Sequence, residues 1–357
     1  METFSCKTKI ISGVGAIREL KQLECKRLLL VADPFFQKTD IPNRIKNATN
    51  AQEVAYFYEV TPDPTVELSA KGTALVQTFA PDTVVALGGG SAIDCAKAMV
   101  YFSGKQIRFA AIPTTSGSGS EVTDFSVLTH NGTKHPLVDK QLQPELAILD
   151  GELLCTLPKS LIADAGYDVI AHAVESYVAT GSGAISRALA RDAFATVYAE
   201  LTASYNGNTQ VRQQIHVAAT MAGIAFSQSG LGLCHAMAHA LGGRFHVPHG
   251  RLNAILLPAV VEANAVANGR YGELARSAGL GGAADTMAVR NLKNALIRLR
   301  RELKLPQSLT QVGISAGAVM DETLIQAVLA DPCCQTNPAK PDAGMVRQVL
   351  QRVTGNG

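Results

Sequence analysis

Two pairs of potential metal ligands stand four residues apart in the sequence: Asp168 with His172, and His235 with His239. Residues i and i+4 of a helix share a face, so each pair can aim at one point. His249 follows glycines and a proline, and is expected to be a loop residue that folds back. One carboxylate with several imidazoles suits Fe(II) or Zn(II) better than magnesium or calcium, which prefer oxygen. The alternative is a set of unrelated histidines, which we disfavour because four of the eight histidines belong to this group.

The composition describes a large globular chain with no unusual charge. With 357 residues, of which 47% are hydrophobic, two domains with sizeable cores are expected. The net charge is +2 and there is no basic stripe, which argues against nucleic-acid or membrane partners. No secretory signal and no apolar run of membrane-spanning length are visible, so a cytoplasmic location is expected. The cysteine spacings match no zinc motif, and reduced thiols are expected.

The order of elements predicts an α/β N-terminal domain and an all-α C-terminal domain. Strands are expected near 26–33, 53–60, 82–90 and 108–115, with helices over 66–80 and 91–102. Such alternation is typical of a parallel sheet covered by helices. After Pro158 alanine-rich segments with helical spacing dominate, including 160–180, 184–204, 209–228, 231–243 and 252–278. The predicted domains are therefore 1–158 and 159–357.

The segment VVALGGGSAIDCAK (84–97) predicts a phosphate-binding turn. A buried strand ends in glycines, including Gly89 and Gly90, and a helix then begins near Ser91. Glycines let backbone N–H groups approach a ligand, and a helix N-terminus favours an anion. Asp94 lies in the first helical turn and is expected either to hold a ribose hydroxyl or to cap the helix. The turn differs from the GxGxxG pattern of the common dinucleotide fingerprint.

A second polar loop, IPTTSGSGSEVTD (112–124), follows the next predicted strand. It offers Thr114, Thr115 and Ser118 to phosphate and ribose oxygens. Taken alone it would be an ordinary surface loop, but two such loops at consecutive strand ends favour a dinucleotide site. Asp33 ends the strand LLLVAD, where a carboxylate suits a ribose 2′-hydroxyl and repels a 2′-phosphate, which favours NAD(H). A simple loop aspartate is the alternative for Asp33.

These segments together resemble the iron-containing (group III) alcohol dehydrogenase family. GGGSAIDCAK, PTTSGSGSEVT, AILDGELLCTLP, GYDVIAHAVESY and GLCHAMAHALGGRFHVPHG with NAILLP match the family in order. The nearest branch is that of the ethanolamine and propanediol utilisation enzymes. The resemblance implies the dehydroquinate synthase-like fold, with an α/β dinucleotide-binding domain, an all-helical metal-binding domain and a cleft between them.

The resemblance also assigns residues. The implied metal ligands are Asp168, His172, His235 and His249. His239 becomes a near-site residue, as proton relay to the product oxygen or as an orienting group. Phe226 and Phe125 are expected to line the substrate pocket. The implied coenzyme contacts are Asp33, Gly89, Gly90, Ser91, Asp94, Thr114, Thr115, Ser118, Thr123, Val127 and Lys134. Where the family usually reads PNPT, this chain has Asp63 in place of the asparagine, so Asp63 is left without a role.

The implied reaction is Fe²⁺-dependent hydride transfer between NAD(H) and a short-chain primary alcohol or its aldehyde, with reduction of propanal or acetaldehyde as the expected direction. Zn²⁺ is a possible substitute for iron. Three alternatives remain: a zinc-type polyol (glycerol) dehydrogenase, a dehydroquinate-synthase-like lyase, and a non-enzymatic metal- and nucleotide-binding protein. Besides the small aldehyde or alcohol, the expected partner is a second copy of the chain in a homodimer. The enzyme is expected to be cytoplasmic, and association with a bacterial microcompartment stays open.

Overall fold

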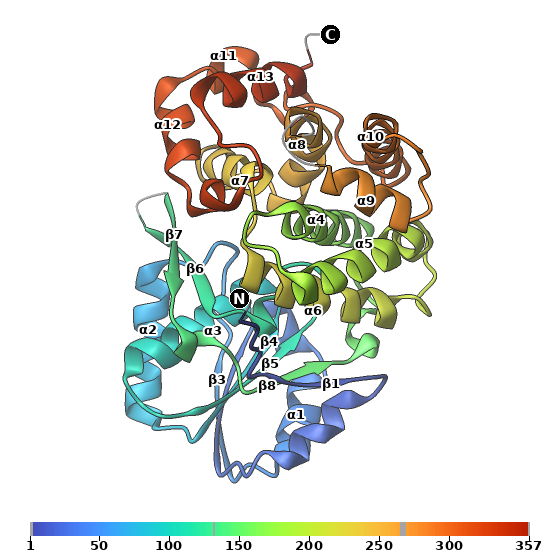
Figure 1. Ribbon diagram of the computed structural model, residues 1–357. Coiled ribbons are helices and arrows are strands. Elements are labelled where there is room, and N and C mark those ends of the chain that lie inside the picture. The colour runs from blue at the N-terminus through green and yellow to red at the C-terminus, as the bar shows by residue number, and fades with distance from the viewer. Residues whose placement is uncertain (1–2, 131–132, 265–268, 356–357) are drawn as a thin grey trace. The chain divides into compact units, whose positions relative to one another are not determined.

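The computed structural model describes the chain except residues 1–2, 131–132, 265–268 and 356–357. It divides into two compact units. The α/β unit comprises Ser5–Leu157 and Arg212–Thr220, and the helical unit comprises Met1–Phe4, Pro158–Val211 and Met221–Gly357. The fold class expected from the sequence is confirmed: a parallel six-stranded sheet precedes a helical C-terminal region (Figure 1).

The sheet of the α/β unit has the strand order β1-β8-β5-β4-β2-β3, and its paired strands are all parallel. Its strands are β1 (Lys9–Ser12), β2 (Arg27–Ala32), β3 (Glu53–Phe57), β4 (Thr83–Gly88), β5 (Arg108–Pro113) and β8 (Leu146–Leu149). The helices are α1 (Ile41–Thr49), α2 (Val66–Phe79) and α3 (Gly90–Ser103). An antiparallel hairpin of β6 (Phe125–His130) and β7 (Thr133–Val138) stands outside this sheet and was not predicted.

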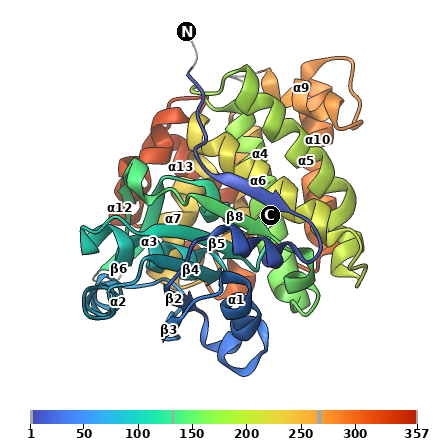
Figure 2. The ribbon, with the colours of Figure 1, turned by 90° about the horizontal axis from the view of Figure 1, so that it is seen from below.

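Both faces of the sheet are buried, as the continuous apolar strands require. Along β2, Leu28 and Leu30 join one core cluster with α1, while Leu29 and Val31 join a second cluster with α2 and α3. Successive side chains of a strand point to opposite faces, which explains this alternation. Figures 1 and 2 show α1 on one side of the sheet and α2 on the other.

The helical unit is built around α4 (Lys159–Val178), which is buried along most of its length. It packs against α5 (Ala184–Tyr205), α7 (Leu233–Phe245), α8 (His249–Asn264) and α9 (Arg270–Ser277). The remaining helices are α6 (Arg212–Ser229), α10 (Asp285–Glu302), α11 (Ala316–Val319), α12 (Glu322–Ala330) and α13 (Ala343–Val353), and the 3-10 turn η7 (Pro332–Thr336) precedes α13. The helix expected over 252–278 is instead α8 followed by α9, and part of the connection lies outside the described residues.

The first half of α6, Arg212–Thr220, belongs to the α/β unit, whereas the sequence predicted that the whole helix lies in the domain 159–357. Its side chains explain the assignment. Gln213 donates to the Leu149 carbonyl at 3.1 Å, and Thr220 donates to Glu121 at 2.6 Å. His216 is buried 3.0 Å from the Ser116 hydroxyl, and burial lowers its pKa to about 4, so it packs as a neutral ring.

Among the described residues no single helix is both long and apolar enough to cross a membrane, although α6 and α7 together would qualify by length and composition, with a 103° bend between them.

We expect Gly250→Ala to destabilise the helical unit, because a Cβ at Gly250 would lie 1.9 Å from the Asp164 carbonyl oxygen of α4. The Cβ would meet backbone atoms of α4, so no flexible side chain can move aside to make room for it. The free energy of unfolding should therefore fall by about 2 kcal/mol. Urea denaturation followed by circular dichroism measures the change. Gly317→Ala is the control, since a Cβ there meets nothing within 4 Å. Equal stability of the two variants would contradict the close helix contact.

Candidate metal centre and coenzyme loops

Three helices of the helical unit bring Asp168, His235 and His249 together. Donor atoms of these residues all lie within 4.8 Å of one another. Oδ1 of Asp168 is 3.7 Å from Nε2 of His235 and 3.6 Å from Nε2 of His249. His249 is the first residue of α8, where a loop residue was expected. Such spacing leaves room for one ion with metal–ligand bonds of about 2.1 Å.

His172, the fourth predicted ligand, lies against this group as an aromatic neighbour. Its ring stacks on that of His235, with centroids 4.6 Å apart, and on Phe226 at 4.4 Å. Its nitrogens fall outside the close three-residue group. The structure therefore places His172 and Phe226 beside the centre, and the ligand role of His172 stays a prediction.

Asn253, which the sequence analysis missed, points its side-chain amide at all three donor atoms. Nδ2 is 2.7 Å from Oδ1 of Asp168, 3.3 Å from Nε2 of His235 and 3.2 Å from Nε2 of His249. The amide has two hydrogens for these three atoms, so it marks the point on which they converge. The position of Asn253, four residues after His249 on α8, was the available signal.

Glu175 was also missed, and it joins α4 to the start of α7. Its carboxylate lies 2.5 Å from Nδ1 of His235 and accepts the backbone N–H groups of Cys234 at 2.7 Å and His235 at 3.2 Å. It therefore satisfies unpaired donors at the helix N-terminus and orients the ring. Because Nδ1–H donates to Glu175, Nε2 is directed toward Asp168 and Asn253. Glu175 follows Asp168 by two helical turns, which placed it on the same face.

The electrostatics of the group favour a cation. Burial alone would raise the pKa of Asp168, but neighbouring His172, His249 and His235 hold it well below its usual range. Burial lowers the pKa of His235, but Asp168 and Glu175 outweigh it and raise that pKa to about 9. A metal at Nε2 would therefore displace a proton, so metal affinity should fall as the pH drops below that value. The donor set fits Fe(II) or Zn(II).

His239 lies close by with a different partner. Its Nδ1 is 2.9 Å from a carboxylate oxygen of Asp331, and its ring stacks on His249 with centroids 5.2 Å apart. It is outside the Asp168 group. Sequence spacing gave no hint of Asp331, which is 92 residues away along the chain.

In the α/β unit the two polar loops pack against each other. The backbone N–H of Thr114 donates to the Gly88 carbonyl at 2.9 Å. A Cβ on Gly89 would lie 3.1 Å from the Thr115 hydroxyl, and one on Gly90 would lie 2.9 Å from that of Ser118. Ser91 follows in the first turn of α3. The ends of β4 and β5 therefore bring together the glycine turn and the threonine–serine loop predicted to hold phosphate.

Asp33 stands beside the same turn, at the end of β2. A Cβ on Gly88 would lie 2.9 Å from its Oδ2. Burial raises the pKa of Asp33, and a hydrogen bond from the Gly89 backbone opposes this shift. The predicted ribose-binding carboxylate is therefore adjacent to the predicted phosphate turn.

Other predicted coenzyme contacts are occupied within the protein. Asp94 accepts from the Ser120 hydroxyl and from the backbone N–H of Val127, the latter at 2.9 Å. Thr123 is buried and accepts from Nζ of Lys97 through both its carbonyl, at 2.9 Å, and its hydroxyl, at 3.0 Å. These contacts support neither of the two roles considered for Asp94, because its carboxylate joins α3 to Ser120 of the second loop and to Val127 of β6.

Nζ of Lys134 lies 2.6 Å from Oδ1 of Asp63. Asp63, which replaces the asparagine of the family's PNPT pattern, therefore has a salt-bridge partner. Asp63 adopts a left-handed backbone conformation with φ of 52°. Phe125 lies on β6, where its carbonyl accepts from Lys97 at 2.7 Å. Phe125 and Phe226 belong to different units, so their shared pocket stays a prediction.

Comparison with known proteins identifies the family of this chain. The family model described as "Iron-containing alcohol dehydrogenase" matches residues 7–151, and "Fe-containing alcohol dehydrogenase family, C-terminal" matches residues 162–354. The chain belongs to the iron-containing alcohol dehydrogenase family. A 1-propanol dehydrogenase of Citrobacter freundii is 39% identical over 99% of this chain and 100% of its own.

Two further relatives support the family. An NADPH-dependent butanol dehydrogenase of Clostridium saccharobutylicum is 34% identical over 99% of this chain and 98% of its own. The solved iron-containing alcohol dehydrogenase of Thermococcus thioreducens superposes with a TM-score of 0.93 at 31% identity, covering 99% of this chain and 100% of that one. Membership of this family shows that the chain is an oxidoreductase.

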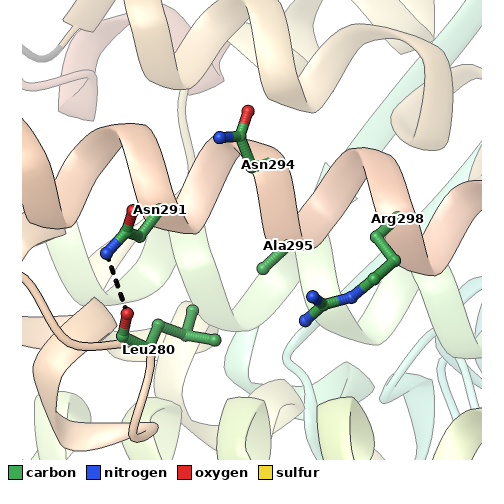
Figure 3. A pocket seen from close by; sticks show the side chains of 5 residues that line it. All are labelled: Leu280, Asn291, Asn294, Ala295 and Arg298. Atoms are coloured by element: carbon green, nitrogen blue, oxygen red, sulfur yellow. Dashed lines mark hydrogen bonds between the residues drawn. The ribbon is translucent and has the colours of Figure 1, made fainter.

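A pocket of about 270 Å³ lies along α10 (Figure 3). Leu280, Asn291, Asn294, Ala295 and Arg298 line it. Asn291 donates to the Leu280 carbonyl at 2.9 Å, and Arg298 donates to the Tyr198 hydroxyl at 2.6 Å. It contains none of the predicted site residues, and we assign it no role in the reaction.

Replacing Glu175 by Gln should weaken metal binding about 10- to 100-fold, because His235 loses the anionic partner that orients its ring. Competition with a chelator measures the affinity. Glu262→Gln is the control, since Glu262 makes an exposed pair with Lys293. Unchanged affinity in the Glu175 variant would show that the carboxylate serves the fold alone.

Proposed function

We propose that this protein is an Fe²⁺-dependent, NAD(H)-linked alcohol dehydrogenase that interconverts a short-chain primary alcohol and its aldehyde, with aldehyde reduction as its main direction. The observation that carries the proposal is the convergence of the Asp168, His235 and His249 donor atoms within 4.8 Å in a chain of this family. The similar 1-propanol dehydrogenase supports propanal as a substrate, and acetaldehyde is a smaller alternative.

The proposed metal ligands are Asp168, His172, His235 and His249, with Zn²⁺ as a substitute for iron. The metal would supply Lewis acidity at the substrate oxygen. Glu175 keeps Nδ1 of His235 engaged, so that Nε2 faces the centre. Nδ2 of Asn253 lies 3.3 Å from Nε2 of His235 and 3.2 Å from Nε2 of His249, so both nitrogens face the same point. The protein thus prepares the ligand geometry through hydrogen bonds outside the ligand set.

We propose His239 as the group that exchanges a proton with the product oxygen. Asp331 accepts the hydrogen bond of Nδ1, which leaves Nε2 to accept or donate the transferred proton. A purely orienting role for His239 is the alternative. Phe226 stacks on His172 and offers an apolar wall beside the centre, which suits a small aldehyde.

NAD(H) is proposed as the coenzyme, with its phosphates at the Gly89–Gly90 turn and the start of α3. Asp33 lies beside this turn and would repel a 2′-phosphate. Lys134 is paired with Asp63, so its charge is balanced and attracts an additional phosphate less strongly. The relative described as NADPH-dependent makes this coenzyme choice worth measuring.

The lyase alternative is disfavoured by charge. A phosphorylated, carboxylated substrate requires free cations, whereas Arg251, two residues after His249, makes a two-point pair with Asp164 at 2.9 and 3.2 Å. A polyol dehydrogenase would share these ligands, and comparing glycerol with 1-propanol as substrates separates the two. A binding protein without activity would show no turnover with either.

We expect His235→Ala and His249→Ala to lose bound metal and to reduce propanal at least about a thousandfold more slowly, because each removes a ligand and several kcal/mol of Lewis-acid stabilisation. Metal analysis of anaerobically purified protein, together with NADH absorbance, measures both effects. His246→Ala, a helix-end residue of α7, is the control. Full metal content and full rate in either ligand variant would refute the assignment.

Asp33→Gly should reduce the preference for NADH over NADPH about tenfold or more, because it removes a charged hydrogen-bond acceptor and a repulsive charge. The ratio of kcat/KM for the two coenzymes is the measurement. Asp40→Gly, at the start of α1, is the matched control. An unchanged preference would mean that Asp33 is a simple loop aspartate.

A further inference from the structure

A second group of metal-binding side chains lies where α7 meets η7. His239, Asp331 and Cys333 each offer a donor atom, and these atoms lie within 4.8 Å of one another. Nδ1 of His239 is 2.9 Å from Oδ2 of Asp331. The other oxygen of Asp331 accepts the backbone N–H of Cys333 at 2.8 Å, so the carboxylate is fixed at the start of η7.

The geometry and the chemistry of this group both suit a cation. Two ligands on one tetrahedral zinc, with bonds near 2.0–2.1 Å, stand about 3.3 Å apart. The His239–Asp331 separation of 2.9 Å is only slightly shorter. Nitrogen, oxygen and sulfur together select borderline or soft ions such as Zn²⁺ and Cd²⁺, and they do not suit Mg²⁺ or Ca²⁺.

The surroundings are negatively charged. Burial, followed by the carboxylates of Asp331 and Glu175, raises the pKa of the Cys333 thiol well above its usual value. The same carboxylates attract a cation, and a thiol that binds a metal is deprotonated by it. The side chains of His239 and Asp331 remain 30% and 15% exposed, which leaves a route for the ion and a place for water as a further ligand.

We propose that His239, Asp331 and Cys333 form a second binding site for a soft or borderline divalent cation, distinct from the Asp168 centre. Binding an ion there replaces the His239–Asp331 hydrogen bond with two metal bonds. Nδ1 of His239 gives up its proton while Nε2 takes one up from solvent, so the ring stays neutral and the net release to solvent is the thiol proton of Cys333. The proposal for binding is independent of the proposed function. Its consequence, inhibition by excess Zn²⁺, rests on the role proposed for His239.

Cadmium titration tests the site, because a cadmium–thiolate bond gives an ultraviolet charge-transfer absorption and the Asp168 centre has no sulfur ligand. The titration uses full-length protein whose exposed Cys155 is replaced by Ser. We expect an absorption that saturates when one equivalent of Cd²⁺ is bound at this site, in addition to any that the Asp168 centre takes up without absorbing. Cys333→Ser should abolish it and weaken binding at least about tenfold.

Cys334→Ser is the matched control, since its thiol instead contacts the Val328 carbonyl at 3.1 Å; it should keep the absorption. His172→Ala should keep it too, even if the Asp168 centre or the proposed reaction fails. No absorption, an absorption that survives in Cys333→Ser, or its loss in Cys334→Ser as well would overturn the proposal.

Zinc inhibition provides the second readout. Excess Zn²⁺ should lower the rate of propanal reduction in the parent protein and in Cys334→Ser, whereas Cys333→Ser should retain its rate. Equal inhibition of all three proteins would overturn the inhibitory role, while the cadmium spectra decide separately whether the site binds a metal.

Discussion

The buried carboxylate of Glu175 is the constraint on which the metal-centre geometry depends. It is 1% exposed and accepts hydrogen bonds from the ring of His235 and from two backbone groups at the start of α7. A buried charge without such partners costs several kcal/mol. Any displacement of α7 relative to α4 would break several of these contacts together. The two helices that carry Asp168 and His235 are therefore held in one register.

The third helix of the centre is held by different means. Gly250 lets the start of α8 approach the backbone of α4 closely, and the adjacent His249 is thereby carried to Asp168. One turn later, Asn253 donates to Asp168 and accepts from the thiol of Cys234 at 3.4 Å. The centre is thus preorganised by a glycine contact on one side of α8 and an amide on another. Such support outside the ligand set fixes ring orientation before any ion binds.

The features predicted from the sequence were those with local signals. The strand–glycine–helix turn and the paired ligands of α4 and α7 depend on spacings of a few residues, which the sequence displays directly. The residues that support them could not be predicted in the same way. Asp331 meets His239 across 92 positions, and Asp94 reaches Val127 across 33, so only the folded chain brings these pairs together. The β6–β7 hairpin did have a local signal that was overlooked, because the sequence Asn-Gly at 131–132 separates its two strands and is the commonest two-residue hairpin sequence.

In both units, cationic side chains near the predicted sites have partners within the protein. In the helical unit Arg251 is paired with Asp164, and in the α/β unit Lys134 is paired with Asp63. Buried Lys97 donates to backbone carbonyls, and burial lowers its pKa to about 8. An aldehyde is uncharged, so its recognition gains nothing from a free cation, whereas an acidic substrate would require one. The balanced cations beside the predicted sites are therefore consistent with the small neutral substrate proposed above.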